Sequence, residues 1–327
     1  MKNYVVERFG AEVAAEAASR WGINDADLID LGGFESFVYE APIAGADAVL
    51  KIGHSDRRSV DLLVAEAEFT RYLAAESITV SAALVSSAGN LVERMPDGSG
   101  AEFLATAWSK APGDAVGREN DDAKFWAAHG ALLGRMHSAS ISYKPTGLRR
   151  PDWDDMVFLD DSLHIPETDI AATQHRDTIL RSLRELPKDR GTYGLVHHDA
   201  HGGNVLFDGT AVTIFDFDDC GYNWFANDLA IVMYYSLLAF DDPVDAAHSI
   251  WPVFIDAYQN HHHLEPWWFE QFALFLAWRD NLLLSVIHRS RASITDMDVD
   301  AWIAGYHERH ATGLPLIDFD FTTGVVA

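Results

Sequence analysis

The spacing of apolar residues divides the chain into a first part with many short strands and a second part that is mainly helical. Apolar residues at helical spacing over 59–75 predict a helix, and the Ala- and Glu-rich stretch 11–20 predicts another. Shorter apolar runs bounded by turn residues predict strands. These runs lie at 28–40, 48–52, 80–85, 91–95 and 103–107. Their order predicts a small α+β lobe.

The pattern changes at the breaker Ala111-Pro112-Gly113. A strong helix is predicted over 123–137, and the chain is mostly helical and aromatic from Trp224 onward. Residues 144–170 hold several Pro, Asp and Gly, which predict no regular element. Between these parts lie a helical stretch and two short apolar stretches with polar insertions, at 179–186, 195–207 and 212–217.

A chain of 327 residues suggests two domains or lobes. We place the boundary near residues 105–110. This gives a nucleotide-binding N-lobe over 1–105, and a C-lobe over 106–327 that carries the catalytic loop, the metal site and the acceptor pocket.

The composition, with 48% apolar and 23% charged residues, is that of an ordinary globular protein. The net charge of −26, from 24 basic and 50 acidic residues, opposes binding to nucleic acids and anionic membranes. Cys220 is the single cysteine, so no internal disulfide can form. Charged side chains over 1–20 oppose a signal peptide, and the apolar run Leu229–Phe240 is too short to span a bilayer. We expect a cytoplasmic protein.

One constellation of polar residues points to phosphoryl transfer. Asp199 lies five residues before Asn204, and Asp216 follows twelve residues later at the end of an apolar strand. Phosphoryl transfer needs a carboxylate for the acceptor hydroxyl, and an amide oxygen and a second carboxylate for Mg²⁺. Each residue alone is more often an ordinary turn residue. Their joint spacing favours catalysis.

These residues resemble the motif of the aminoglycoside phosphotransferase and choline kinase superfamily. The resemblance implies a bilobal protein-kinase-like α+β fold, with a small N-terminal antiparallel-sheet lobe and a larger, mainly helical C-terminal lobe. It implies that Asp199 is the catalytic base, that Asn204 and Asp216 bind Mg²⁺, and that His197 and Asp228 brace the catalytic loop. The chain carries His198 where the family usually has Gly.

The N-terminal part of the chain also carries residues that match the family's pattern. The turn containing Gly33 and Ser36 resembles the family's nucleotide-covering turn, although an ordinary hairpin has the same pattern. Lys51, inside a short apolar strand, matches the lysine that binds nucleotide phosphates; a lone lysine there is usually an edge residue. The resemblance makes Glu66 its ion-pair partner, with Glu68 as the competing candidate.

Two further segments have implied roles. The backbone of Ala107 and Trp108 would meet the adenine edge as part of the lobe connection. Asp218 and Asp219 would touch metal or substrate, or be solvated. Asp218 stands where eukaryotic-type protein kinases have Gly, which argues against regulation through an activation loop. These details look closest to a bacterial branch that includes a stress-response Ser/Thr protein kinase.

Other tempting features have plainer interpretations. The run His261-His262-His263 is read as a solvated turn, because metal ligands must converge from different elements or lie at helical spacing. The aromatic cluster over 267–278 is read mainly as core. Arg279 and Asp280 are candidates for the acceptor site.

The sequence therefore predicts an ATP- and Mg²⁺-dependent phosphotransferase, a kinase that transfers the γ-phosphoryl group to an acceptor hydroxyl. The expected acceptor is a small molecule such as an aminoglycoside, an amino sugar or an amino alcohol. Two alternatives stay open. One is a Ser/Thr protein kinase with a protein substrate, and the other is a pseudokinase that serves as a nucleotide-binding scaffold.

Overall fold

The computed structural model describes residues 1–33, 35–155, 164–291, 294 and 297–325. The described residues form two compact units. Unit 1 comprises Met1–Gly113, Tyr143–Arg150 and Thr213–Asp218. Unit 2 comprises Asp114–Ser142, Pro151–Val212 and Asp219–Ala327. Unit 1 therefore contains two segments that are distant in sequence from its main part.

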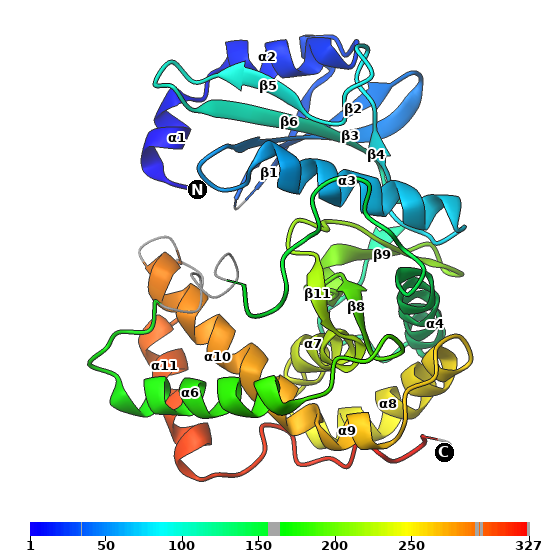
Figure 1. Cartoon of the computed structure of the whole chain (residues 1–327), viewed down its shortest axis with the longest axis vertical. Coiled ribbons are helices and arrows are strands. Elements are labelled where there is room, and N and C mark those ends of the chain that lie inside the picture. The colour runs from blue at the N-terminus through cyan, green and yellow to red at the C-terminus, as the bar shows by residue number, and fades with distance from the viewer. Residues whose placement is uncertain (34, 156–163, 292–293, 295–296, 326–327) are drawn as a thin grey trace. The chain divides into compact units, whose positions relative to one another are not determined.

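Unit 1 is an antiparallel sheet with helices on its two faces (Figure 1). Its strands pair in the order β1-β2-β3-β6-β4. The strand β5 pairs with the N-terminal half of β6, and β4 pairs with the C-terminal half. The helices of this unit are α1 Asn3–Arg8, α2 Ala11–Arg20 and α3 Val60–Ala75, with a 3-10 turn at Asp25–Asp27. The strands are β1 Ile29–Gly32, β2 Phe37–Ile43, β3 Ala46–His54, β4 Ala83–Leu84, β5 Glu93–Pro96 and β6 Glu102–Ser109.

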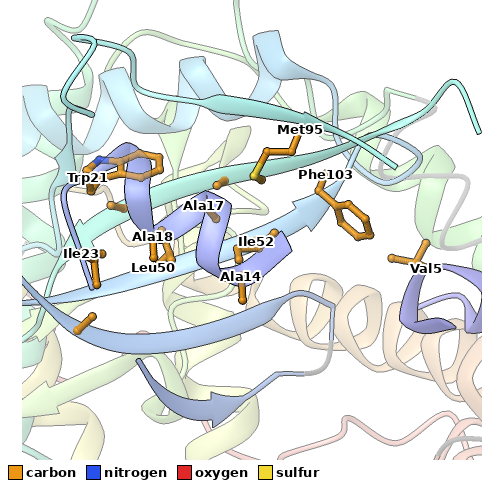
Figure 2. Close-up of a cluster of buried hydrophobic side chains, with 13 residues drawn as sticks. Val5, Ala14, Ala17, Ala18, Trp21, Ile23, Leu50, Ile52, Met95 and Phe103 are labelled. Carbon is orange, nitrogen blue, oxygen red and sulfur yellow. The ribbon is translucent and has the colours of Figure 1, made fainter. Parts of the chain in front are cut away.

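The alternation of side chains along β6 builds two cores. Phe103, Ala105 and Ala107 pack with α2 and β3 in one buried cluster (Figure 2). Leu104 and Trp108 point to the other face, where they pack in separate clusters with residues of α3. Successive residues of a strand face opposite sides of the sheet, so a central strand buried on both faces reads as one apolar run. This is why β6 was recognisable from sequence.

Unit 2 is mainly helical, and α7, nearly all buried, runs through its centre. Its helices are α4 Ala123–Ser140, α6 Ile170–Glu185, α7 Phe225–Leu237, α8 Pro243–Gln259, α9 Trp267–Glu270, α10 Phe272–Ser290 and α11 Val299–Ala311. Two antiparallel strand pairs lie wholly within this unit. They are β7 Asp114–Ala115 with β9 Val205–Phe207, and β8 Tyr193–Val196 with β11 Gly221–Trp224. In β10 (Val212–Ile214) the chain passes from unit 2 to unit 1.

Glycines on α4 allow α8 to approach its backbone closely. A Cβ atom on Gly130 would lie 2.1 Å from the carbonyl oxygen of Phe254, and one on Gly134 would lie 2.6 Å from that of Tyr258. These two positions are four residues apart and therefore share one face of the helix. Close packing of α4 on α8 thus depends on glycine, which has no side chain, at both positions.

Most predicted elements are present, with shifted bounds. The predicted helices 11–20, 59–75 and 123–137 correspond to α2, α3 and α4, and Leu229–Phe240 lies largely in the buried helix α7. The sequence did not indicate α1, and α6 begins at Ile170, before the predicted start. No helix among the described residues is long and apolar enough to cross a membrane.

Candidate active site

The alternation of side chains between the two faces of β3 determines where Lys51 points. Residues 48, 50, 52 and 54 of this strand are buried on one face, and Lys51 points to the other. Its Nζ atom lies 2.7 Å from Oδ1 of Asp216. Burial alone would lower the pKa of the Lys51 amine, but the carboxylates of Asp218 and Asp216 outweigh burial and raise that pKa. The amine is therefore held in its cationic form.

Asp218 is buried, 5% exposed, and forms ion pairs with two consecutive arginines. Arg57 contacts its carboxylate directly, and Nη2 of Arg58 lies 3.3 Å from Oδ2. Although burial opposes the charge of Asp218, Lys51, Arg58 and Arg57 hold the pKa of this carboxyl well below its usual range. Neither a solvated role nor an open metal ligand fits this environment. Asp218 is an anchor within unit 1.

The segment that carries Asp216 is fixed on both sides. Arg150, 3% exposed, donates from Nη2 to the backbone carbonyl of Asp218 at 2.6 Å, and from Nη1 to that of Leu62 on α3 at 3.0 Å. Phe217, fully buried, packs edge-on against Phe69 of α3. Asp216 itself has a φ of 61°, a left-handed conformation that costs a non-glycine residue energy. These contacts hold it there.

Glu66 lies beside this network on α3, but it does not pair with Lys51 as the resemblance implied. Among the described residues, the carboxylate that forms an ion pair with Lys51 is that of Asp216. Burial raises the pKa of Glu66 to about 8, against the attraction of the Lys51 charge. Asp216, with 45% of its side chain exposed, is more solvated than Glu66, which is buried. Glu68 lies elsewhere and accepts a hydrogen bond from Thr146.

The remaining candidates of unit 1 have distinct environments. Ser36 is buried and lines a small cavity, of about 20 Å³, together with Lys51, Glu66 and Asp218. This volume holds about one water molecule. A Cβ atom on Gly33 would lie 2.1 Å from the carbonyl oxygen of Ser36, so the turn requires glycine there; Phe34 lies outside the described residues. The positions Ala107 and Trp108 are paired with β3 on one side and β4 on the other.

In unit 2, Asp228 of α7 holds the start of the loop that follows β8. Its carboxylate accepts hydrogen bonds from the backbone N–H groups of His197, at 3.2 Å, and His198, at 2.7 Å. His137 of α4 adds a contact of 3.2 Å to the same carboxylate. His198 has a φ of 69°, a conformation that glycine adopts freely. The Asp228 bond thus stabilises the strained position where the family usually has Gly.

Asp199 is surrounded by donors on both carboxylate oxygens. Oδ1 forms an ion pair with Arg279 of α10, and Oδ2 accepts from Nδ2 of Asn204 at 3.1 Å. Nε2 of His201 lies 3.3 Å from Oδ2. Burial opposes the charge on Asp199, but Arg279 and His201 hold the pKa of this carboxyl well below its usual range. The spacing between Asp199 and Asn204 predicted their proximity; nothing in the sequence pattern assigned Arg279 to Asp199.

Two side chains, one in each unit, offer oxygens of the kind that hard divalent cations prefer. Because Nδ2 of Asn204 donates to Oδ2 and to the backbone carbonyl of Asp199, its Oδ1 points away from them, and no described residue donates to it. Asp216 offers a carboxylate that is 45% exposed and pairs with Lys51 through Oδ1. Mg²⁺ is bound in proteins by one or two such oxygens together with water and substrate phosphates. The described residues contain no group of three His, Cys, Asp or Glu side chains that could hold a metal alone.

Two expectations outside the central motifs need correction. The histidine run is a turn, but His262 is buried, because Nδ1 lies 3.1 Å from Oγ of Ser138 and Nε2 lies 3.0 Å from the carbonyl oxygen of Gly191. Asp280 is fully buried and accepts from Tyr234 and Arg309. It therefore cannot meet an acceptor, and of the two polar candidates on α10 only Arg279 reaches Asp199.

Comparison with known proteins gives matches over most of the chain. The model of a family described as "Phosphotransferase enzyme family" matches residues 29–268. The amicoumacin kinase of Bacillus subtilis (strain 168) is 35% identical over 318 residues, which cover 95% of each chain.

Solved structures agree with this match. The structure of amicoumacin kinase hAmiN in complex with AMP-PNP, Ca²⁺ and Ami has a TM-score of 0.92 and 29% identity, and the alignment covers 98% of this chain and 99% of the other. A microcompartment-associated aminopropanol kinase has a TM-score of 0.73 at 19% identity, covering 93% and 98%, and shares the fold.

Proposed function

The chain belongs to the phosphotransferase enzyme family, and on that premise we propose that it phosphorylates an amicoumacin-type antibiotic. One observation carries the choice of acceptor. A kinase named for amicoumacin is 35% identical over 95% of both chains, so the likeness includes the C-terminal helices as well as the shared motifs. The likeness to amicoumacin kinase hAmiN over 98% of the chain supports the same acceptor.

The family and these relatives confirm several expectations from the sequence. The protein is a kinase of the aminoglycoside phosphotransferase type, with the protein-kinase-like fold, and it transfers a phosphoryl group to a hydroxyl of a small molecule. It uses ATP and a divalent cation. Phosphoryl transfer to a small molecule is thus favoured over the protein-kinase and pseudokinase alternatives. The cytoplasmic location stays a prediction; we retain it because ATP is available there.

Asp199 is assigned as the catalytic base. The acceptor oxygen forms a bond to the γ-phosphorus, the bond from that phosphorus to the β-phosphate oxygen breaks with its electron pair leaving on ADP, and the hydroxyl proton passes to Asp199. The ion pair with Arg279 and the hydrogen bond from Asn204 orient the carboxylate for this step. Asp228 fixes the backbone that leads to it.

The remaining assignments follow from the charged groups and oxygen atoms of the two units. In unit 1, Lys51 neutralises nucleotide phosphates. Glu66 lines the small cavity beside Lys51, and Gly33 and Ser36 form the covering turn. Ala107 and Trp108, which lie on β6 of unit 1, are assigned to the adenine side. Asn204, in the catalytic part over 106–327, and Asp216 would supply oxygen ligands to Mg²⁺, which would neutralise charge on the phosphates.

The proposal is tested by ADP release from Mg·ATP against a panel of acceptors. The panel contains amicoumacin, aminoglycosides, an amino sugar, 1-amino-2-propanol, choline and a generic Ser/Thr protein. We expect stimulation by amicoumacin and loss of turnover by about 10³-fold in Asp199→Asn, because the amide cannot take the proton.

Asp121→Asn is the matched control, since it makes the same change at an exposed position of unit 2. It should retain wild-type turnover. Stimulation by another small molecule but not by amicoumacin would replace the proposed acceptor. Equal activity of Asp199→Asn and the wild type would overturn the assignment of the base.

A further inference from the structure

The two oxygens of Asp199 differ in how many donors they already meet. Oδ2 has two partners, Asn204 at 3.1 Å and His201 at 3.3 Å. In the described part of the chain, the partner of Oδ1 is the guanidinium of Arg279. A carboxylate oxygen can accept two hydrogen bonds in its plane. Oδ1 therefore keeps one position for another donor, directly beside the guanidinium of Arg279.

The guanidinium also keeps donors that the protein does not use. Nη2 donates its two hydrogens to Oδ1 of Asp199 and to the hydroxyl oxygen of Tyr235, the latter at 2.9 Å. Nε is buried and meets no acceptor among the described residues. The side chain is 15% exposed, and Nη1 donates to no described residue either. Buried N–H groups without partners are uncommon, and a ligand oxygen is one way to satisfy them.

Arg279 is held firmly in this position. Its centre of charge lies 4.9 Å from the ring centroid of Tyr235 on α7, a favourable cation–π distance. The neighbouring residue Asp280 accepts from Tyr234 of α7 at 2.6 Å and from Arg309 of α11 at 3.1 Å. Two consecutive residues of α10 thus bind two consecutive residues of α7. The unused N–H groups are presented by a fixed side chain.

We propose that Oδ1 of Asp199 takes the proton of the acceptor hydroxyl, and that Arg279 binds a second oxygen of the same acceptor. Arg279 is then both a positioning residue for the base and an acceptor-binding residue. It selects acceptors that carry another hydroxyl or carbonyl oxygen close to the reacting hydroxyl. The inference rests on the proposed function, because it concerns the acceptor of that reaction.

The test uses Arg279→Lys and Arg279→Ala in the full-length protein. With amicoumacin as acceptor, we expect kcat to fall about 100-fold in Arg279→Ala and the KM for the acceptor to rise about tenfold, because charged donors at the reacting group are lost. The Kd for AMP-PNP, measured by calorimetry, should stay unchanged, since the assigned nucleotide residues lie in unit 1. Millimolar guanidinium ion should restore part of kcat in Arg279→Ala, and Arg279→Lys should retain an intermediate kcat.

Arg309→Ala is the matched control, because it removes another arginine that pairs with α10. It should lower the melting temperature without guanidinium rescue of turnover. The inference is overturned if Arg279→Ala keeps its acceptor KM, or if guanidinium fails to restore any kcat while both Arg279 variants remain folded by circular dichroism.

Failure of the proposed function is separable from failure of this inference. If the wild type does not act on amicoumacin, the acceptor is wrong. The role of Arg279 is then measured in the slow ATP hydrolysis without acceptor, where water occupies the place of the hydroxyl beside Oδ1. The same loss of kcat and the same guanidinium rescue are expected there. Their absence would overturn the positioning role.

Discussion

Nζ of Lys51 lies 2.7 Å from Oδ1 of Asp216, although 165 positions separate the two residues in the sequence. The same aspartate was expected as a metal ligand, and Glu66 was expected as the partner of Lys51. The ion pair links β3, which carries Lys51, to the segment between β10 and β11. The charge balance of unit 1 therefore depends on Asp216 and Asp218 more than on Glu66.

Asp218→Asn should destabilise the protein strongly. The substitution removes the buried carboxylate that neutralises Arg57 and Arg58, and breaking a buried ion pair from one side costs about 3 kcal/mol. Urea denaturation would show a lower midpoint. Asp27→Asn, the same change at an exposed position of unit 1, should leave the midpoint unchanged. Equal midpoints for both variants would mean that the arginines do not need Asp218.

Glu66→Gln should change how stability depends on pH. In the folded protein the pKa of Glu66 is raised from 4.5 to about 8, so between these pH values the folded state holds a proton that the unfolded state has lost. Raising the pH through this interval removes that stabilisation from the wild type. The free energy of unfolding of Glu66→Gln, relative to the wild type, should rise from about pH 4.5 to about pH 8 and then level off. Urea titrations across this range measure it. A constant difference would contradict the raised pKa.

Gly130→Ala should destabilise unit 2 by about 2 kcal/mol, because the new Cβ would overlap the backbone of α8 and force the two helices apart. Denaturant unfolding measures the loss. Gly191→Ala is the control, since a Cβ atom there has no neighbour within 4 Å and its φ is not positive. A stabilised Gly130→Ala would show that helix propensity outweighs the contact.

His198→Gly should retain most of the wild-type kcat, whereas His198→Val should lose most of it. The loop needs a left-handed backbone at this position, which glycine adopts freely and a β-branched residue adopts with strain. Steady-state kinetics with the wild-type acceptor compare the two. If both variants lost turnover equally, the imidazole itself would be required, and the family's usual glycine would not be equivalent.

The elements of the site were predictable where the signal is local. The helices α2, α3 and α4 and the strand β6 follow from the spacing of apolar residues within one element. Asp199 and Asn204 share one short loop, so five residues of sequence already placed them near each other. The bracing by Asp228 followed from the resemblance to a known motif, whereas the close approach that requires glycine at Gly33 came from the structure.

The contacts that complete the site follow from tertiary packing alone. Sequence by itself determined the reaction class, because the residues that carry it occupy short, recognisable motifs. It did not assign Arg57, Arg58 and Arg150 to Asp218, or Arg279 to Asp199. It also missed the burial of His262 and Asp280. An ion pair between residues far apart in the chain depends on which faces of two elements meet and on the burial that results, and neither is encoded in the spacing of any single segment.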